Sequence, residues 1–545
     1  MIEAWDSGAV RAAERPLLDT GVPLMERAAF ALAVVVVRDV ARRRATPGID
    51  GELADGPVRG ARAVLLVGAG NNGGDALHAG AHLAVRGMAV TALLVDARAH
   101  AGGLAALRRA GGRVVPLHEP AGRRRWDAVL DDVAAADVVL DGLVGIGAQG
   151  PLRGLAAELV AGLRERLGGD DDRGGAGGGG AGGGGGGGRP WVVAVDAPSG
   201  IGVDDGTVPG PVLPADRTVT FGAAKPGLLL PPATHLTGRG AVVDLGLDLP
   251  AAGAAVARLE DADVARAWPV PGPTDHKYTR GVVGVVAGTA TYPGAAVLAS
   301  SAAVHAGAGM VRYLGPEAVG RAVVAARPEV VTATGRVQAW VLGSGLPAEG
   351  PDDGQRGRAR AALAAATGAD EPSDGGGHGP VPVVADAGAL GLLDAPCPPW
   401  VVVTPHAGEL ATLLSARGED VERADVEAEP LRWARRAHEL LGATVLLKGG
   451  ATVVVGPGGA YAQADAPGWL ATAGAGDVLA GLLGTMLAGR SAEVVARPER
   501  AAEVAAAAAL VHGRAAERAN PGGPVAALDV AGALPATVAG LLALR

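Results

Sequence analysis

The stretch Ala471-Thr472-Ala473-Gly474-Ala475-Gly476-Asp477-Val478-Leu479-Ala480-Gly481 joins a glycine-rich turn to an apolar helical pattern. Glycines at 474 and 476 allow backbone N–H groups to converge on one point, and the following helix adds its positive end there. Asp477 is expected in the first helical turn, beside this anion site. An anion site with an adjacent carboxylate suits phosphoryl transfer, in which positioning and charge neutralisation dominate. The alternative is a plain strand-to-helix turn with an N-terminal Asp.

The composition indicates a chain long enough for two or more complete domains, with 545 residues of which 49% are hydrophobic. A net charge of −9 argues against nucleic acid or an anionic membrane as the main partner. The single cysteine, Cys397, excludes an intrachain disulfide framework and a cysteine zinc cluster. No signal-peptide pattern opens the chain, and the apolar run 30–37 is too short to span a bilayer. We therefore expect a soluble, cytoplasmic protein that acts on small molecules.

Lysine is rare in this chain, because only Lys225, Lys277 and Lys448 occur among 48 basic residues. An ammonium group is a compact point charge, whereas a guanidinium group is a wide planar fork. In a sequence that favours arginine, a lysine is therefore expected where arginine cannot replace it. Lys225 and Lys448 each follow a predicted strand, at 218–221 and 444–447, which makes both of them candidate site residues.

The first half of the chain opens with a strand, a glycine loop, a helix and a second strand, with strands expected at 63–67 and 90–95. The loop glycines match the dinucleotide-binding fingerprint, which is a weak signal in a chain with 89 glycines. The run Asn71-Asn72-Gly73-Gly74-Asp75 is more specific, because asparagine side chains can ligate a cation or hold a polar ligand. Alternatively, the asparagines only tolerate left-handed turn geometry.

Two further strands of this half are expected to end at carboxylates, with 137–140 leading to Asp141 and 191–195 leading to Asp196. The carboxyl ends of parallel strands are where doubly wound folds bind their ligands. Asp75, Asp141 and Asp196 are therefore expected to converge on one crevice. For each of them alone, a cap or turn role is the simpler explanation.

A second α/β series follows the proline-rich segment 269–273. We predict two doubly wound α/β domains, at 1–255 and 262–545, with a glycine-rich insertion at about 168–188 and a polar insertion at about 350–380. No Walker A loop, His-Glu-x-x-His motif or Gly-x-Ser-x-Gly elbow is present in the sequence. The turn at 474–477 is therefore expected to take the phosphate role in the second half.

Both halves resemble known families. The first half resembles NAD(P)H-hydrate epimerase, a Rossmann-like domain, in the loop 68–75 and in the motifs Leu140-Asp141, Val195-Asp196-Ala197-Pro198-Ser199-Gly200 and Lys225-Pro226-Gly227-Leu228. The second half resembles ADP-dependent NAD(P)H-hydrate dehydratase, which has a ribokinase-like fold. The matching motifs are His276-Lys277, Gly294-Ala295, Gly343-x-Gly345-Leu346, Thr404-Pro405-His406-x-Gly408-Glu409, Lys448-Gly449 and Gly474-x-Gly476-Asp477. The order and fusion of the halves match the bifunctional repair enzyme.

The resemblance implies repair of reduced nicotinamide that has taken up water at ring position C6. The first half would interconvert the R and S hydrates with a bound potassium ion, held by Asn72, Asp141 and Ser199. Asp141 and Lys225 would be its catalytic residues. The hydrate would lie along a larger set, consisting of Asn71, Asn72, Gly73, Gly74, Asp75, Gly145, Ile146, Gly147, Ala148, Gln149, Gly150, Pro151 and Asp196.

For the second half, the resemblance implies phosphoryl transfer from ADP, with Mg²⁺, to the C6 hydroxyl of the S hydrate. Phosphate then leaves, which regenerates NADH or NADPH. Asp477 is expected to take the hydroxyl proton as general base. The hydrate would contact Ala295, Gly345, His406 and Asp477, and the nucleotide would contact Lys448, Gly449, Gly450, Ala451, Thr452 and Gly476. We also expect a homo-oligomer.

Three positions depart from the family pattern: Ala76 where glycine is usual, Ser344 where proline is usual, and Gly388 where a second acid is usual. We expect none of them to touch the residues assigned to chemistry. Two alternatives to the repair enzyme stay open. One is a ribokinase-like small-molecule kinase with an accessory N-terminal dinucleotide-binding domain. The other is an N-terminal domain that serves as a non-enzymatic scaffold.

Overall fold

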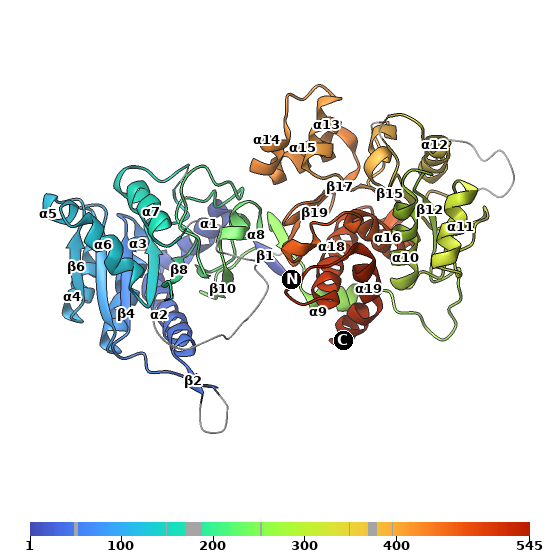
Figure 1. Ribbon diagram of the computed structural model, residues 1–545. Coiled ribbons are helices and arrows are strands. Elements are labelled where there is room, and N and C mark those ends of the chain that lie inside the picture. Colours follow the sequence, from blue (N-terminus) through green and yellow to red (C-terminus); the bar gives the residue numbers. More distant parts are fainter. Residues whose placement is uncertain are drawn as a thin grey trace. The chain divides into compact units, whose positions relative to one another are not determined.

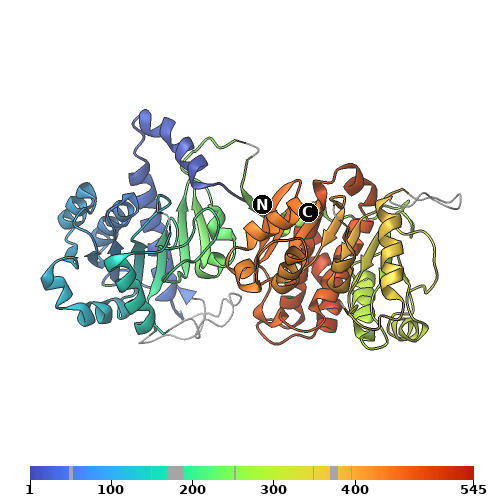
Figure 2. The same cartoon turned by 90° about the horizontal axis from the view of Figure 1, so that it is seen from above.

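The computed structural model describes residues 1–47, 53–148, 150–168, 188–250, 253–347, 349–368, 379–394 and 396–545. The chain forms two compact units, one at Glu3–Ala255 and the other at Val256–Arg545 together with Met1 and Ile2. In each unit, helices cover both faces of a largely parallel sheet (Figures 1 and 2). The predicted doubly wound α/β class is therefore confirmed. Gln149 and most of the predicted insertion at 168–188 lie outside the described residues.

The sheet of the first unit has the order β10-β9-β8-β7-β4-β5-β6, and all its strand pairs are parallel. Its strands are β4 (Arg62–Val67), β5 (Ala89–Leu94), β6 (Arg113–Pro116), β7 (Val138–Gly142), β8 (Trp191–Val195), β9 (Arg217–Phe221) and β10 (Arg239–Val243). Its helices are α1 (Ser7–Asp19), α2 (Leu24–Arg43), α3 (Asn71–Val85), α4 (Ala101–Arg109), α5 (Pro120–Arg123), α6 (Trp126–Ala134), α7 (Gly154–Arg166), α8 (Pro226–Leu229) and η2 (Ala233–Leu236). A separate short ladder pairs β2 (Thr46–Pro47) with β3 (Leu53–Ala54), and β1 (Ile2–Ala4) contains the boundary between the units.

Strand β4 shows how the apolar pattern builds this unit, because its successive side chains enter different cores. Ala63, Leu65 and Val67 pack with residues of α2, α3 and α4, whereas Val64 and Leu66 pack with residues of α6 and α7. A strand buried on both faces requires the uninterrupted apolar run that the sequence shows. The chain reverses its direction across the sheet between β4 and β7, and doubly wound folds bind ligands at such a switch point.

The sheet of the second unit runs β11-β19-β18-β17-β16-β15-β14-β12-β13. Its strand pairs are parallel except β17–β18 and β18–β19. The strands are β11 (Val256–Arg258), β12 (Val282–Val286), β13 (Met310–Tyr313), β14 (Ala339–Leu342), β15 (Val383–Ala385), β16 (Val401–Val403), β17 (Thr444–Leu447), β18 (Thr452–Gly456) and β19 (Gly459–Gln463). The helices are α9 (Asp261–Ala267), α10 (Pro293–His305), α11 (Glu317–Ala326), α12 (Gln355–Thr367), α13 (Ala407–Ser415), α14 (Arg423–Ala428), α15 (Pro430–Leu441), α16 (Ala475–Ala488), α17 (Ser491–Ala496), α18 (Arg500–Ala519) and α19 (Ala527–Leu542), with short turns η3 (Ala387–Leu392) and η4 (Gly468–Leu470).

Helix α16 is the central helix of this unit, and it packs against α10 and α18. It begins at Ala475 and carries Asp477 in its first turn, as the sequence predicts. Gly474 precedes it with a φ of +86°, and a Cβ there would lie 2.5 Å from Leu298. Only glycine meets both conditions at that turn.

The range 350–380, predicted as a polar insertion, contains helix α12, and its first residue, Gln355, is fully buried. Within the part of the chain that the structure describes, no single helix is long and apolar enough to cross a membrane. Only α1 and α2 taken together pass that test, and they are bent by 114° at their junction.

Candidate active sites

The first candidate site lies where the loops after β4, β7 and β8 meet, and Asp141 is its most buried member. Asp141 has no exposed surface. Its carboxylate accepts hydrogen bonds from the Ser199 hydroxyl at 2.6 Å, the Ser199 N–H at 2.8 Å and the Leu143 N–H at 3.3 Å. Burial raises the pKa of Asp141, and the bonds from Ser199 and Leu143 oppose that rise. Because these donors are fixed, Asp141 is held in one orientation.

The Val144 carbonyl lies beside this cluster and connects two predicted ion ligands. It accepts a hydrogen bond from the Asn72 side chain at 2.9 Å and one from the Ser199 hydroxyl at 3.3 Å. The structure therefore brings Asn72, Asp141 and Ser199 together, as the sequence predicts. Carboxylate, hydroxyl and carbonyl oxygens, which are ligands of hard cations, come from Asp141, Ser199 and Val144, while Asn72 contacts the Val144 carbonyl through its amide nitrogen.

A second cluster of this unit is centred on Lys225, whose side chain is 1% exposed. Its ammonium donates to Asp196 at 2.5 Å, to the Thr220 hydroxyl at 2.8 Å and to the Phe221 carbonyl at 2.9 Å. Asp196 has a φ of +66°, an uncommon conformation for a residue other than glycine. Strained backbone of this kind concentrates at functional sites.

Asp75, the fifth residue of α3, belongs to the same cluster. One of its carboxylate oxygens is buried and has no hydrogen-bond partner. Burial raises the pKa of Asp75 to about 8, and the nearby carboxyls of Asp196 and Glu14 add to that rise against Lys225. Asp141 does not contribute to this electrostatic cluster. Of the three carboxylates expected to converge, Asp75 and Asp196 therefore act on each other, while Asp141 is bonded to a separate set of groups.

The loop after β7 carries the remaining residues predicted to bind the hydrate. A Cβ on Gly145 would lie 3.2 Å from the Asn72 side chain, which places this loop against the start of α3. Ile146 packs partly buried against apolar residues, and the Ala148 N–H donates to the Gly145 carbonyl at 3.0 Å. The structure gives no corresponding contact for Asn71, which is exposed.

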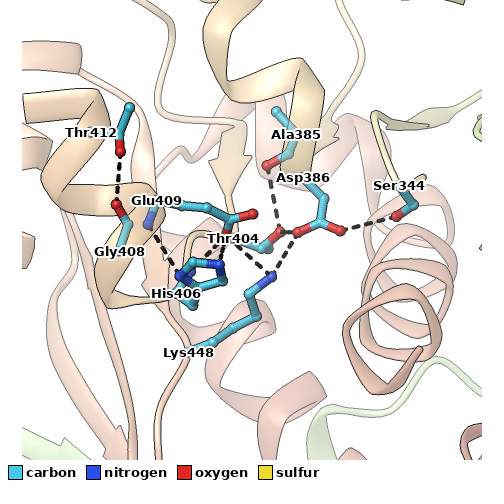
Figure 3. Close-up of polar contacts among 9 residues, drawn as sticks. All are labelled: Ser344, Ala385, Asp386, Thr404, His406, Gly408, Glu409, Thr412 and Lys448. Carbon is cyan, nitrogen blue, oxygen red and sulfur yellow. Dashed lines mark hydrogen bonds and ion pairs between the residues drawn. The ribbon is translucent and has the colours of Figure 1, made fainter. Parts of the chain in front are cut away.

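The second unit has its candidate site at the carboxyl ends of β14, β15, β16 and β17. Asp386, which follows β15, accepts hydrogen bonds from Lys448 at 2.8 Å, Thr404 at 2.8 Å and Ser344 at 3.0 Å (Figure 3). Asp386 is 3% exposed, so these donors replace the water that a carboxylate requires. Asp386 was not assigned to chemistry from the sequence, although its place at a strand end was a usable signal.

Lys448 links Asp386 to helix α13. Its ammonium also lies 3.8 Å from Glu409, which bonds the His406 N–H at 2.9 Å in a capping box (Figure 3). Burial lowers the pKa of Lys448, but the attraction of Asp386, Glu409 and Asp477 more than offsets this and leaves the pKa raised. Lys448 therefore stays positively charged near neutral pH.

Asp477 lies close to the same charges. Burial and the Asp386 carboxylate raise the pKa of Asp477 to about 6, while a hydrogen bond with Ser344 and the charge of Lys448 lower it. Ser344 is fully buried. The expectation that no departure from the family pattern touches the chemistry is therefore wrong for Ser344.

The remaining predicted residues of this site lie around these charges. A Cβ on Gly345 would lie 2.5 Å from the Ala295 side chain, and a Cβ on Gly476 would lie 3.4 Å from the Lys448 ammonium. Lys448 begins the turn between β17 and β18, and this turn contains the segment predicted to bind nucleotide. At Gly388 a Cβ would lie 2.5 Å from the Leu346 carbonyl oxygen, so the acid usual there has no room.

Comparisons with known proteins match both units. The family described as YjeF-related protein N-terminus matches residues 22–227, and the family described as NAD(P)H-hydrate dehydratase matches residues 283–530. The chain is 42% identical over 539 residues to the bifunctional NAD(P)H-hydrate repair enzyme Nnr of Mycobacterium leprae, covering 95% of this chain and 94% of that protein. The chain belongs to the bifunctional NAD(P)H-hydrate repair enzymes. It combines an epimerase with a dehydratase, as the sequence predicts.

Two further similarities concern one half each. The NAD(P)H-hydrate epimerase of Microbacterium testaceum is 40% identical over 276 residues, covering 50% of this chain and 90% of that protein. The solved structure of the ADP/ATP-dependent NAD(P)H-hydrate dehydratase from Bacillus subtilis is 24% identical, with a TM-score of 0.44, and covers 52% of this chain and 99% of that chain.

Proposed function

We propose that the first unit interconverts the R and S hydrates of NADH and NADPH with a potassium ion, and that the second unit dehydrates the S hydrate with ADP as phosphoryl donor. The observation that carries this proposal is the arrangement of Asp477, Lys448 and Gly476 at the start of α16. A carboxylate with a pKa near 6, an ammonium and a glycine turn meet there. These are the base, the cation and the anion cradle that phosphoryl transfer needs.

In the second unit, Asp477 takes the proton of the C6 hydroxyl while that oxygen attacks the terminal phosphoryl group of ADP. With a pKa of about 6, Asp477 is mostly ionised at neutral pH and accepts the proton without a large penalty. The amides after Gly474 and the Lys448 ammonium stabilise charge on the moving phosphoryl group. Phosphate then leaves C6, and loss of a ring proton restores the reduced nicotinamide.

In the first unit, Asn72, Asp141, Ser199 and the Val144 carbonyl would hold the potassium ion. The oxygen-rich donor set fits such a cation, and the described residues contain no group of three or more His, Cys, Asp or Glu side chains that could hold a metal. When bound, the ion supplies fixed positive charge near the hydrate. Because its carboxylate is fully buried and bonded, Asp141 is better suited to holding that ion than to moving a proton.

The other assignments follow the predicted residues. The hydrate lies along Asn71–Asp75 and the loop 145–151 in the first unit, and contacts Ala295, Gly345 and His406 in the second. Nucleotide binds at Lys448–Thr452 and Gly476, and Mg²⁺ enters with the nucleotide phosphates, as is usual for this ion. A homo-oligomeric state and a cytoplasmic location stay predictions.

The decisive experiment follows reduced nicotinamide by its absorbance after the protein is mixed with hydrated NADH and ADP. Full recovery from a mixture of R and S hydrates requires both activities, whereas recovery of only the S fraction shows the dehydratase alone. Matched reactions with ATP in place of ADP test the choice of donor. Failure to recover absorbance with either donor, together with phosphorylation of sugars or vitamin precursors, would favour the kinase alternative instead.

A further inference from the structure

Two neighbouring carboxyls of the first unit differ sharply in the donors that they receive. A single oxygen of Asp196 accepts hydrogen bonds from Lys225 at 2.5 Å, Thr220 at 2.9 Å and the Phe221 N–H at 3.2 Å. One oxygen of Asp75 is buried and receives none, and Asp75 as a whole is 8% exposed. Hydrogen bonds from donors favour the ionised form of a carboxyl, and Asp75 lacks them at its buried oxygen, so Asp75 is expected to hold a proton.

The balance of charge in this cluster leads to the same assignment. The one ammonium, Lys225, faces the carboxyls of Asp75, Asp196 and Glu14. For Asp75, the charge of Lys225 is outweighed by burial and by the carboxyls of Asp196 and Glu14, which raise its pKa to about 8. Burial also raises the pKa of Glu14, where Lys225 and Arg11 oppose the rise and Asp196 adds to it. Pairs of carboxyls in such unlike environments supply an acid and a base in many enzymes.

We propose that Asp75, in its neutral form, is the general acid of the epimerase site, an assignment that rests on the proposed epimerisation of the hydrates. Its partner Asp196, which Lys225 and Thr220 fix in place, stabilises positive charge that develops on the nicotinamide ring.

The proposed step is balanced without any further reagent. Asp75 gives its proton to the C6 hydroxyl as the C6–O bond breaks, and both bond electrons leave with the oxygen as water. The ring nitrogen shares its lone pair with C6, which leaves a cationic iminium next to the Asp196 carboxylate. Water then adds to the other face of C6, and its proton returns to Asp75. The product is the opposite epimer, and the enzyme is unchanged.

The test compares Asp75→Asn with the wild-type protein in the full chain. Pure S hydrate is incubated with potassium but without ADP, so that only epimerisation proceeds, and the R hydrate is measured by chromatography. We expect kcat to fall by about 10²–10⁴-fold with KM close to the wild-type value, because the amide keeps the size of the side chain but is not an acid. Asp131→Asn, an exposed carboxylate on α6, is the matched control and should keep the wild-type rate.

Two further readouts separate an acid from a structural residue. The wild-type exchange rate should fall as pH rises through about 8, and this limb should be absent from the residual activity of Asp75→Asn. The pKa of Asp75 is higher in the folded protein than in the unfolded chain. Between about pH 4 and pH 8, Asp75 ionises more readily in the unfolded chain, so the free energy of unfolding falls as pH rises, and above about pH 8 this loss is constant. The melting temperature of Asp75→Asn relative to wild type should therefore rise across that range.

The outcomes are distinct. Wild-type exchange together with a near-normal kcat and an unchanged pH profile in Asp75→Asn would overturn the role of Asp75 and leave the epimerase assignment standing. A raised KM with unchanged kcat would also overturn it, since Asp75 would then only bind the hydrate. Absence of exchange in the wild-type protein with potassium would overturn the epimerase assignment itself, and the acid role with it.

Discussion

In the first unit Lys225 is bonded to Asp196 beside Asp75, and in the second unit Lys448 is bonded to Asp386 beside Asp477. Each site thus contains one carboxyl group that accepts hydrogen bonds from several donors, a lysine among them. Each also contains a second carboxyl whose pKa is raised by burial and by the first. The two sites differ in their access to water, since the side chain of Lys225 is 1% exposed and that of Lys448 is 23% exposed.

This difference accounts for the opposite chemical roles that we propose for Asp75 and Asp477. Asp75 is the more deeply buried and has a pKa of about 8, so it carries a proton at neutral pH. Asp477 is less buried, is bonded by Ser344 and has a pKa of about 6, so it is mostly ionised at neutral pH. The same pairing of a lysine-bound carboxylate with a second carboxyl can therefore supply an acid in one unit and a base in the other.

The largest effect is expected for Asp477→Asn, which should lower the dehydration rate by about 10²–10⁴-fold. The N-cap of α16 is Gly474, and asparagine keeps the size of the aspartate side chain, so the melting temperature should change little. Nucleotide affinity should be kept or rise slightly, because a negative charge near the phosphates is lost. The measurements are dehydration of S hydrate with ADP, nucleotide binding and melting temperature. A mutant that dehydrates at nearly the wild-type rate would leave Asp477 as a first-turn residue of α16 without a catalytic role.

The two lysines provide the next test of the comparison. Lys225→Met leaves buried Asp196 without its cation and should lower the free energy of unfolding by about 3–5 kcal/mol. Lys448→Met should cost less, about 1–2 kcal/mol, because the Lys448 side chain is 23% exposed and water can partly replace its ammonium beside Asp386, yet it should weaken nucleotide binding. Lys277→Met, at an exposed position, is the control for both. Denaturant unfolding with each variant gives the ranking, and equal losses for Lys225 and Lys448 would contradict the difference in exposure.

The rarity of lysine and the positions of strand ends predicted more of the residues at these two sites than motif spacing did. Lys225 and Lys448 were singled out because lysine is rare, and both are bonded to buried carboxylates. The same signal says little about Lys277, which is exposed beside the ring of Tyr278. The apolar run of β4 and the glycine turn before α16 could also be predicted, because the periods of strands and helices are local properties of a sequence.

The contacts that shift the pKa values of Asp75 and Asp477 could not be predicted from the sequence in the same way. Glu14 lies on α1 and Asp386 follows β15, and their effects on Asp75 and Asp477 arise only when distant segments meet. The sequence alone predicts no role for Ser344 where proline is usual, because the neighbouring residues do not show that its hydroxyl lies close to Asp386 and Asp477. Tertiary convergence of this kind decides pKa values, and a sequence pattern does not contain it.

Asp141→Asn tests whether the cation cluster is separate from the proton-transfer cluster. The Asp141 carboxylate accepts hydrogen bonds from Ser199 and Leu143. The asparagine amide would turn its own N–H donor toward one of these donors, and it would remove a negative charge from the ion site. Exchange of R and S hydrates should fall by roughly 100-fold, while dehydration of S hydrate continues normally. Exchange is measured across a series of potassium concentrations. A wild-type rate at every concentration would show that Asp141 is only a turn residue.

The smallest expected effect, and the most specific, belongs to Ser344. Its hydroxyl donates a hydrogen bond to Asp386 at 3.0 Å (Figure 3). A hydrogen bond with Ser344 also lowers the pKa of Asp477. A hydrogen bond to a charged group contributes about 1.5–3 kcal/mol, which corresponds to a pKa change of about 1–2 units. Ser344→Ala should therefore shift the acid limb of the dehydration profile from about pH 6 to about pH 7 or above. At pH 6 the rate should fall roughly fivefold to fiftyfold, since less Asp477 is ionised, while at pH 9 it should approach the wild-type rate.

The control for Ser344 lies on α10 in the same unit. Ser300 is as deeply buried, but its hydroxyl has no hydrogen-bond partner, so Ser300→Ala removes a similar group without removing a bond. This variant should keep the wild-type acid limb, and Ser344→Thr should restore it by keeping the hydroxyl. A uniform loss of rate at all pH values in Ser344→Ala, with no shift of the limb, would mean that Ser344 acts through packing. The base in the second unit would then owe its ionisation at neutral pH to Lys448 alone.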